Sequence, residues 1–318
     1  MEPTSDLKKI KKEISKIVVG QEEVIDGLLR AILADGHVLV EGVPGIAKTL
    51  LVRTMAVVTG CSFKRIQFTV DLLPTDITGI TAYHEKKGFY IVKGPIFANY
   101  IIADEINRAP PKTQSALLEA MQEKQATIGK ETYPIPIPFF VMANNNPIEQ
   151  AGVYPLPEAQ IDRFLFKLKM GYPDEKQSKE IIEKNITLKR FDDYKLKAVT
   201  NPKEILKMQA YTRSIKHSDK IKDYICKIVI ATRNPKKYGI NLGKYIEWGA
   251  SPRANIGLFI AAKADAVMKG NKYITPSNIK NIAYDVLRHR ILLNYRGRAE
   301  GINTDDVIKE VLAKVPLP

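Results

Sequence analysis

The sequence predicts an α/β fold in which a parallel sheet is sandwiched by helices and is followed by a smaller all-α domain. Short apolar runs typical of buried strands alternate with helical patterns over residues 1–172. One of these strands leads through a glycine-containing loop directly into a helix. Near Tyr172 and Pro173 the strand patterns stop, and only helical patterns follow.

A chain of 318 residues is long enough for two domains with cores of their own. We expect an α/β core at residues 1–172 with an N-terminal helix and two hairpin insertions, a linker at residues 173–200, and an α-helical domain at residues 201–318. Apolar residues at helical spacing predict an amphipathic helix over residues 5–17, with Ser5 as its cap.

The same patterns predict the other elements. In the core we expect further strands at residues 63–68 and 164–170, helices at residues 48–59 and 111–121, and hairpins within residues 71–99 and 125–138. In the second domain and the segment before it we expect helices at residues 174–186, 202–214, 218–233, 252–268, 276–292 and 304–314, several begun by Ser-Pro, Thr-Pro or Asn-Pro.

The formal charge of +14 lies almost entirely in the second part of the chain. Residues 1–172 contain 20 Lys and Arg against 19 Asp and Glu, whereas residues 173–318 contain 29 against 16. Such an asymmetry can mark a face for nucleic acid, an acidic protein or acidic lipid. A lysine-rich solvated helical surface is the alternative, and aromatic residues do not interleave with the basic ones as single-strand stacking platforms require.

Composition excludes several other classes of protein. The N-terminus lacks a basic segment followed by an apolar one, and no uninterrupted apolar run approaches the roughly 18 residues of a membrane span. We therefore expect a soluble, cytoplasmic protein. Cys61 and Cys226 lie far apart and the histidines share no metal-ligand spacing, so neither a disulfide framework nor a zinc site is predicted.

The central motif is GVPGIAKT at residues 42–49, between an apolar strand at residues 37–40 and the start of a helix. It matches the phosphate-binding pattern GxxxxGK[ST], except that Ala47 stands where the second glycine is usual. Glycines let successive backbone N–H groups turn toward anionic oxygens, and the helix N-terminus adds partial positive charge. Alanine is tolerated at this position as long as its φ stays negative.

The residue types of this loop suit a magnesium-nucleotide complex. Lys48 can reach the β- and γ-phosphates, and the Thr49 hydroxyl can coordinate Mg²⁺. A glycine-containing turn that happens to precede a lysine is the alternative. Other motifs in the chain are needed to distinguish a nucleotide-binding loop from such a turn. The residues predicted to contact the nucleotide are Gly42, Val43, Pro44, Gly45, Ile46, Ala47, Lys48, Thr49 and Leu50.

Two acids at the end of an apolar strand are the first such partners. The strand at residues 100–103 leads into Asp104 and Glu105, which is the Walker B arrangement. Asp104 would bind Mg²⁺ directly or through water, and Glu105 would orient and deprotonate the attacking water. A strand that merely ends in two surface acids is the alternative, and the P-loop upstream argues against it.

Polar residues also follow the next apolar strand, at residues 139–143. The amides of Asn144, Asn145 and Asn146 can position water or contact a γ-phosphate, with an asparagine-rich turn as the alternative. A short helix and a last strand follow, and Arg163 between them lies on the rim of the sheet.

The motifs GVPGIAKT, IIADE, ANNNP and LPEAQIDRF, in this order and spacing, closely resemble the MoxR family of AAA+ ATPases. The blocks DLLPTDITG, GPIFANYIIADEINRAPPKTQSALLEAMQE and NPIEQAGVYPLPEAQIDRF look like signatures of that family, and the resemblance reaches SPRANIGL in the second domain. The resemblance implies a P-loop NTPase core of AAA+ type with a helical lid. It also implies ATP and Mg²⁺ as cofactors, a homo-oligomer that is a hexameric ring, and chaperone-like remodelling of protein clients, in some cases with a von Willebrand A domain protein.

The resemblance further implies roles for particular residues. Asn146 would be the sensor-1 asparagine, Arg163 the arginine finger that completes a neighbour's site, and Arg253 the sensor-2 arginine that reaches the phosphates from the lid. Val19 and Gly20 resemble the segment that flanks adenine. The two hairpin regions match insertions that usually face a central pore.

The leading hypothesis is an oligomeric Mg·ATP hydrolase that performs conformational work on a protein. An AAA+ motor acting on nucleic acid is the runner-up because of the basic region, although no helix-turn-helix or winged-helix extension is evident. A scaffold that binds ATP without turnover is disfavoured by the combination of Asp104, Glu105 and Arg163. A simple P-loop kinase is disfavoured because it explains neither the sensor-like asparagine nor the arginine on the rim of the sheet.

Overall fold

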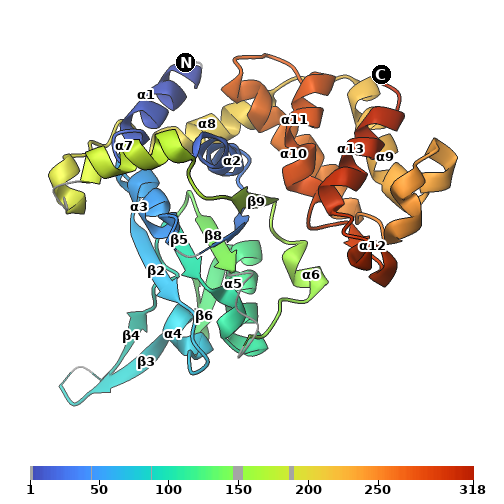
Figure 1. The fold of residues 1–318 in the computed structure, drawn as a ribbon. Helices are drawn as coiled ribbons and strands as arrows, with labels where there is room; N and C mark the ends of the chain where they lie inside the picture. Colours follow the sequence, from blue (N-terminus) through green and yellow to red (C-terminus); the bar gives the residue numbers. More distant parts are fainter. Residues whose placement is uncertain (1–2, 44, 87, 146–152, 186–189) are drawn as a thin grey trace.

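The computed structural model describes residues 3–43, 45–86, 88–145, 153–185 and 190–318. Within these residues the core is a five-stranded parallel sheet in the order β2-β5-β8-β1-β9, which confirms the α/β prediction (Figure 1). Its strands are β1 (Val38–Gly42), β2 (Phe63–Gln67), β5 (Tyr100–Asp104), β8 (Phe140–Asn145) and β9 (Phe166–Met170).

The strand register brings the ends of three strands to one edge of the sheet. Val40 of β1 pairs with Asn144 of β8, and Gln67 of β2 pairs with Asp104 of β5. Since β1, β5 and β8 are neighbours and parallel, the loop after β1, the acids after β5 and the asparagines of β8 meet there. This edge is where ligands bind in open parallel sheets.

Both faces of the sheet are buried, because helices cover each of them. Alternate strand residues such as Val40, Ile102 and Met142 belong to one apolar cluster, and their neighbours such as Ile101 and Val141 belong to another. The first cluster extends into the C-terminal helices. The core helices and short turns are α1 (Thr4–Ile14), α2 (Glu22–Leu33), α3 (Lys48–Val58), α4 (Pro74–Thr78), η1 (Ile106–Arg108), α5 (Pro111–Glu123) and α6 (Glu158–Ile161).

Antiparallel hairpins lie where the sequence predicts them. The first pairs β3 (Gly79–His84) with β4 (Gly88–Lys93) and projects away from the body of the core (Figure 1). The second pairs β6 (Gln125–Ile128) with β7 (Glu131–Pro134).

The C-terminal region contains α8 to α13 and forms the lid. Several bounds agree with the predicted ones, and α7 forms a helix inside the expected linker. The elements are α7 (Glu175–Asn185), η2 (Phe191–Tyr194), α8 (Pro202–Ser214), α9 (Asp219–Arg233), η3 (Pro235–Tyr238), η4 (Asn241–Tyr245), β10 (Ile246–Trp248), α10 (Pro252–Met268), α11 (Pro276–Leu287), β11 (Leu292–Leu293), α12 (Tyr295–Ala299) and α13 (Thr304–Lys314).

Two predicted helix ends are wrong for local reasons. Ser5 is not the cap of α1, because Pro3 occupies the N-cap position and Ser5 already lies inside the helix. The helix predicted to continue to residue 292 ends at Leu287. Beyond this point the chain turns so that Arg288 and Arg290 can donate hydrogen bonds to backbone carbonyls of the core.

A buried ion pair joins the lid to the core. The Asp265 carboxylate of α10 is fully buried and accepts a hydrogen bond from Nε of Arg30 of α2 at 2.9 Å. Asn278 and Asn281 of α11 also donate to it, at 2.8 and 2.7 Å. A buried carboxylate needs such partners, so this cluster fixes the angle between α2 and the lid.

In the part of the chain that the structure describes, no helix is both long and apolar enough to cross a bilayer.

Candidate active site

The predicted nucleotide-binding elements converge on one cavity of about 510 Å³, which we call the P-loop cavity. It brings together residues that lie about one hundred positions apart in the chain. Its lining consists of Gly45, Ile46, Ala47, Lys48, Thr49, Leu50, Asp104, Glu105 and Asn144. Pro44 and Asn146, which were also predicted as site residues, lie outside the described residues.

The backbone of the loop differs from our expectation at Ala47. Its φ is 63°, in the left-handed region, whereas the sequence argument required a negative value. The strain costs about 1–2 kcal/mol for a residue with a Cβ. Ala47 directly precedes α3, which begins at Lys48. Gly42 is required for another reason, because a Cβ there would lie 2.6 Å from the carbonyl oxygen of Met170.

Lys48 lies between the loop and the acids. Its Nζ donates a hydrogen bond to the carbonyl oxygen of Gly42. Burial lowers the pKa of the Lys48 ammonium, and the nearby charges of Asp104 and Glu105 act in the opposite direction. The half-buried ammonium group is thus poised to move from a backbone carbonyl to an anionic ligand in the cavity.

Asp104 is held from two sides. Its Oδ2 accepts hydrogen bonds from Nη2 and Nε of Arg65 at 2.6 and 3.0 Å, and its Oδ1 accepts one from Nδ2 of Asn144 at 2.5 Å. Sequence reasoning missed Arg65. The signal for Arg65 is the pairing of β2 with β5, which periodicity does not reveal: alternate β2 residues lie on the same side of the sheet as Asp104.

Glu105 also has an oriented carboxylate. Its backbone is left-handed, with φ of 56°, and its N–H donates to Oδ1 of Asn144 at 2.8 Å. Nε2 of Gln67 donates to Oε2 of Glu105 at 2.8 Å, and Nε of Arg108 lies 3.4 Å from the same oxygen. Gln67 is a second residue that sequence reasoning missed.

The donor set fits Mg²⁺ bound together with a nucleotide. Thr49 and Asp104 offer a hydroxyl and a carboxylate in the same cavity. Mg²⁺ is usually held by one or two protein oxygens plus phosphates and water, whereas an all-protein site needs more ligands. The described residues contain no group of three or more His, Cys, Asp and Glu that could hold a metal alone.

Arg163 and Arg253 line a different cavity, of about 400 Å³, which we call the arginine cavity. Arg163 follows α6, Arg253 lies in the first turn of α10, and both are exposed. Asp162 and Arg290 also line it. Among the described residues, the P-loop cavity and the arginine cavity share no lining residue: the first is lined by the loop that follows β1, and the second by Asp35, Gly36 and His37, which precede β1.

Comparisons with known proteins agree with this architecture. Residues 37–166 match the family described as ATPase family associated with various cellular activities (AAA), and residues 242–311 match the AAA lid domain. The chain is 46% identical over 311 residues to the chaperone MoxR1 of Mycobacterium tuberculosis, which covers 96% of this chain and 81% of that protein. It is 41% identical over 313 residues to the uncharacterized protein YeaC of Bacillus subtilis, covering 98% and 95%. This chain belongs to the MoxR family of AAA+ ATPases.

A solved structure supports the activity as well as the fold. The crystal structure of a proposed ATPase from Cytophaga hutchinsonii superposes with a TM-score of 0.93 at 45% identity, covering 99% of this chain and 96% of that chain. As a MoxR-family ATPase, the present protein hydrolyses ATP.

The segment expected beside adenine does not line the P-loop cavity of this MoxR-family protein. Val19 is buried, and a Cβ on Gly20 would lie 2.4 Å from the side chain of Gln177 in α7. The structure therefore places Gly20 against α7, which follows the last strand of the core.

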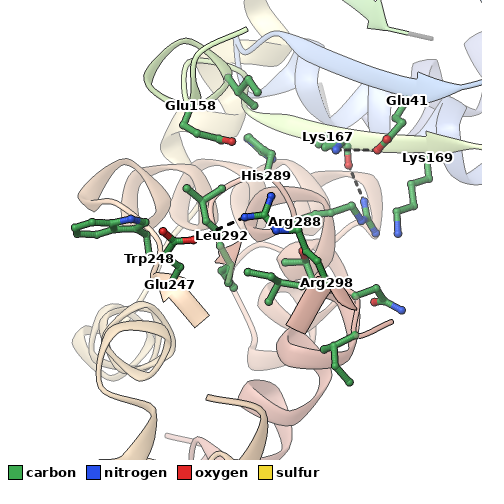
Figure 2. A pocket seen from close by; sticks show the side chains of 16 residues that line it. Glu41, Glu158, Lys167, Lys169, Glu247, Trp248, Arg288, His289, Leu292 and Arg298 are labelled. Atoms are coloured by element: carbon green, nitrogen blue, oxygen red, sulfur yellow. Dashed lines mark hydrogen bonds and ion pairs between the residues drawn. The ribbon is translucent and has the colours of Figure 1, made fainter. Parts of the chain in front are cut away.

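A third cavity, of about 570 Å³, lies between β9 and the lid, and charged residues of both signs line it (Figure 2). Many of these charges are paired: Nζ of Lys167 lies 2.8 Å from Oε2 of Glu41, and Nη1 of Arg288 donates to the carbonyl oxygen of Lys167 at 2.6 Å. Nε2 of the buried His289 bonds to the carbonyl oxygen of Phe164 at 3.0 Å. The contacts of Arg288 and His289 attach the lid to the core, whereas the Lys167–Glu41 pair lies within the core.

Proposed function

We propose that the protein is a Mg²⁺-dependent ATP hydrolase whose active site is completed by a neighbouring subunit. The observation that carries the proposal is the separation of the arginine cavity from the P-loop cavity. Exposed arginines that do not line the P-loop cavity of their own chain are available to the P-loop of another. Each subunit then has a nucleotide face and an arginine face, and such a head-to-tail contact closes into a ring.

The chemistry is divided between the two subunits. In one, the P-loop N–H groups and Lys48 hold the phosphates, and Glu105 orients the attacking water and accepts its proton. Thr49 and Asp104 would hold Mg²⁺, which neutralises phosphate charge when bound. From the other, Arg163 and Arg253 stabilise the charge that develops on the transferred group, an effect worth about 10³- to 10⁵-fold for an arginine finger.

The asparagines at the end of β8 and after it have different roles in our proposal. Asn144 is engaged by Asp104 and Glu105 and supports those acids. Asn146 remains our candidate for sensing the γ-phosphate. Val19 and Gly20 would flank the adenine.

We further propose that turnover serves the chaperone-like remodelling of a protein client. The support is the relationship to a protein named as a chaperone. Six subunits per ring, a pore-facing position of the hairpins and a von Willebrand A domain partner are expectations from the family resemblance. The basic C-terminal part keeps a motor acting on nucleic acid as the alternative, and that motor would show DNA- or RNA-stimulated hydrolysis that weakens as salt rises.

Mixing two inactive variants tests the shared site. Lys48→Ala removes the phosphate contact but keeps the arginines, and Arg163→Ala does the opposite. Each alone should lose nearly all turnover, whereas a one-to-one mixture should regain activity at about a quarter of the interfaces, where an Arg163→Ala subunit receives Arg163 from its neighbour. Arg163→Ala alone should still bind ATP.

The matched control mixes Lys48→Ala with Glu105→Gln. Both defects lie on the nucleotide face, so no interface in this mixture is complete and no activity should return. If Arg163→Ala turns over ATP normally, or if its mixture with Lys48→Ala stays inactive, the neighbour-completed site is wrong. A separate experiment tests the remodelling of a protein client. Affinity capture with ATP-bound Glu105→Gln would identify the client, and a nucleic-acid-binding assay run in parallel would test the alternative.

A further inference from the structure

The carboxylate of Asp162 contacts Arg253 of the arginine cavity, and Asp162 is also the chain neighbour of Arg163. Its Oδ2 accepts a hydrogen bond from Oγ of Ser251 at 2.8 Å, and the same Oγ accepts one from the backbone N–H of Arg253 at 3.1 Å. Nη1 of Arg253 lies 3.8 Å from Oδ2 of Asp162. A single side chain of the core therefore reaches the first turn of the lid helix that carries Arg253.

Arg290 fixes this carboxylate and the backbone around Arg163. Its side chain is only 3% exposed, and its Nε donates to Oδ1 of Asp162 at 2.7 Å. Its Nη2 donates to the carbonyl oxygens of Asp162 and Phe164, at 3.1 and 2.7 Å. These carbonyls belong to the residues immediately before and after Arg163. The planar guanidinium thus holds both sides of the exposed arginine at once.

The positive charge of the buried Arg290 compensates the negative charge of Asp162. Burial lowers the pKa of Arg290 and the Asp162 charge raises it, and a guanidinium stays protonated in proteins. Arg290 therefore neutralises Asp162, which leaves the two exposed arginines with their positive charge. Because Arg290 compensates its charge, the Asp162 carboxylate can lie beside Ser251 and Arg253 without being an unpaired charge.

We propose that Asp162 is a positioning residue for ATP hydrolysis, which holds Arg163 and Arg253 as one paired unit so that a neighbour's nucleotide meets both arginines together. This inference rests on the proposed neighbour-completed site. Asp162 acts through the arginines and does not itself contact the nucleotide. A displacement of about 1 Å in such a group can cost about 10²-fold in rate.

Asp162→Asn tests the proposal, because the amide keeps only one accepting oxygen, so that either Ser251 or Arg290 loses its acceptor, and it removes the charge that faces Arg290. We expect kcat to fall at least about tenfold, with KM for ATP and binding of a fluorescent ATP analogue within about twofold of wild type. Asp305→Asn is the matched control. Asp305 also joins lid and core, accepting from Arg288 and Lys169 at 2.8 Å each, but it lies beside the third cavity. Equal kcat losses in the two variants would show a general lid-docking effect and would overturn the proposal.

Subunit mixing separates this inference from the proposed function. Asp162→Asn mixed with Lys48→Ala should regain activity, and mixed with Arg163→Ala it should not, since those two defects lie on the same face. If Arg163→Ala regains activity with Lys48→Ala but Asp162→Asn does not, the positioning role is wrong while the shared site stands. If neither mixture recovers, the shared site itself fails.

Ser251→Ala gives an independent test should Asp162→Asn fold poorly. It removes the link from Asp162 to the backbone of Arg253, in which the Ser251 hydroxyl also serves as the N-cap of α10. We expect a several-fold loss of kcat in the single variant and no additional loss when it is combined with Arg253→Ala, because both changes act on the same group. A full additional loss in the double variant would contradict the proposed connection.

Discussion

Asn144 donates a hydrogen bond from Nδ2 to Oδ1 of Asp104 at 2.5 Å, across the pairing of β8 with β5. The other end of the same amide, Oδ1, accepts the backbone N–H of Glu105 at 2.8 Å. Asn144 is 2% exposed, so both bonds form away from water. One buried amide therefore orients both of the acids that line the P-loop cavity.

Asn144→Ala should lower kcat by about 10- to 100-fold, because Asp104 and Glu105 lose their shared support. The unsatisfied Glu105 N–H should also cost about 1–3 kcal/mol of unfolding free energy. Steady-state kinetics and urea unfolding measure the two effects.

Asn99→Ala is the control for Asn144→Ala. Asn99 is another buried amide of the same sheet, and it bonds Ser62 and the carbonyl oxygen of Pro138 at the opposite edge. It should lose comparable stability but keep kcat within about twofold. If Asn144→Ala and Asn99→Ala had similar kcat values, Asn144 would not be the residue that orients Asp104 and Glu105 for catalysis.

Glu105→Gln should bind ATP but turn over at least about 100-fold more slowly, because an amide cannot accept the proton of the attacking water. The isosteric side chain can still receive the hydrogen bond from Gln67, so the cavity should keep its shape. Retention of labelled ATP after rapid gel filtration, compared with wild type, measures the effect. Hydrolysis at the wild-type rate would exclude Glu105 as the base.

Patterns in the sequence predicted the sheet and the P-loop cavity because both depend on local signals. Apolar runs identify the buried strands, and parallel strands necessarily bring their ends to one edge, where Asp104 and Asn144 meet. The positions of Arg65 and Gln67 depended on which strand pairs with β5, and strand order is a long-range property that periodicity does not contain.

The placement of the lid arginine could not be predicted from local signals either. Arg253 follows a clear helix start at Ser251 and Pro252, yet its surroundings depend on how the whole lid docks. That docking depends on buried charges such as Asp265 and Arg290, which in the sequence look like ordinary surface residues. α11 also ends earlier than predicted because of this docking, since Arg288 and Arg290 donate hydrogen bonds to carbonyls of the core.

Ala47→Gly should stabilise the protein slightly. The left-handed φ of 63° strains alanine, and glycine removes that strain but adds entropy to the unfolded chain, which leaves a net gain of about 0.5 kcal/mol. Ala210→Gly, at an exposed position inside α8, is the control and should destabilise by about 1 kcal/mol. Urea unfolding of both variants measures the difference. A loss of stability in Ala47→Gly equal to that in the control would show that no strain is relieved at residue 47.

The stability of the protein should fall as the pH drops below neutrality, because His37 is buried in its neutral form. Nδ1 of His37 accepts the backbone N–H of Val141, so Nε2 carries the proton and donates to the carbonyl oxygen of Met121, each at 3.1 Å. Burial lowers the pKa of His37 from 6.5 to about 4. Burial also lowers the pKa of His289, so both histidines act in the same direction.

The direction of the effect follows from which state binds the proton. A histidine whose pKa is lower in the folded state contributes fully above the unfolded value of 6.5, and this contribution is lost as the pH falls toward about 4, because only the unfolded chain takes up the proton. For His37 the loss between pH 7.5 and 5.5 is about 1–1.5 kcal/mol. Urea unfolding at the two pH values should show it, with a smaller difference in His37→Gln and an unchanged one in His84→Gln, which alters an exposed histidine. If His37→Gln kept the full difference between the two pH values, His37 would not be its source.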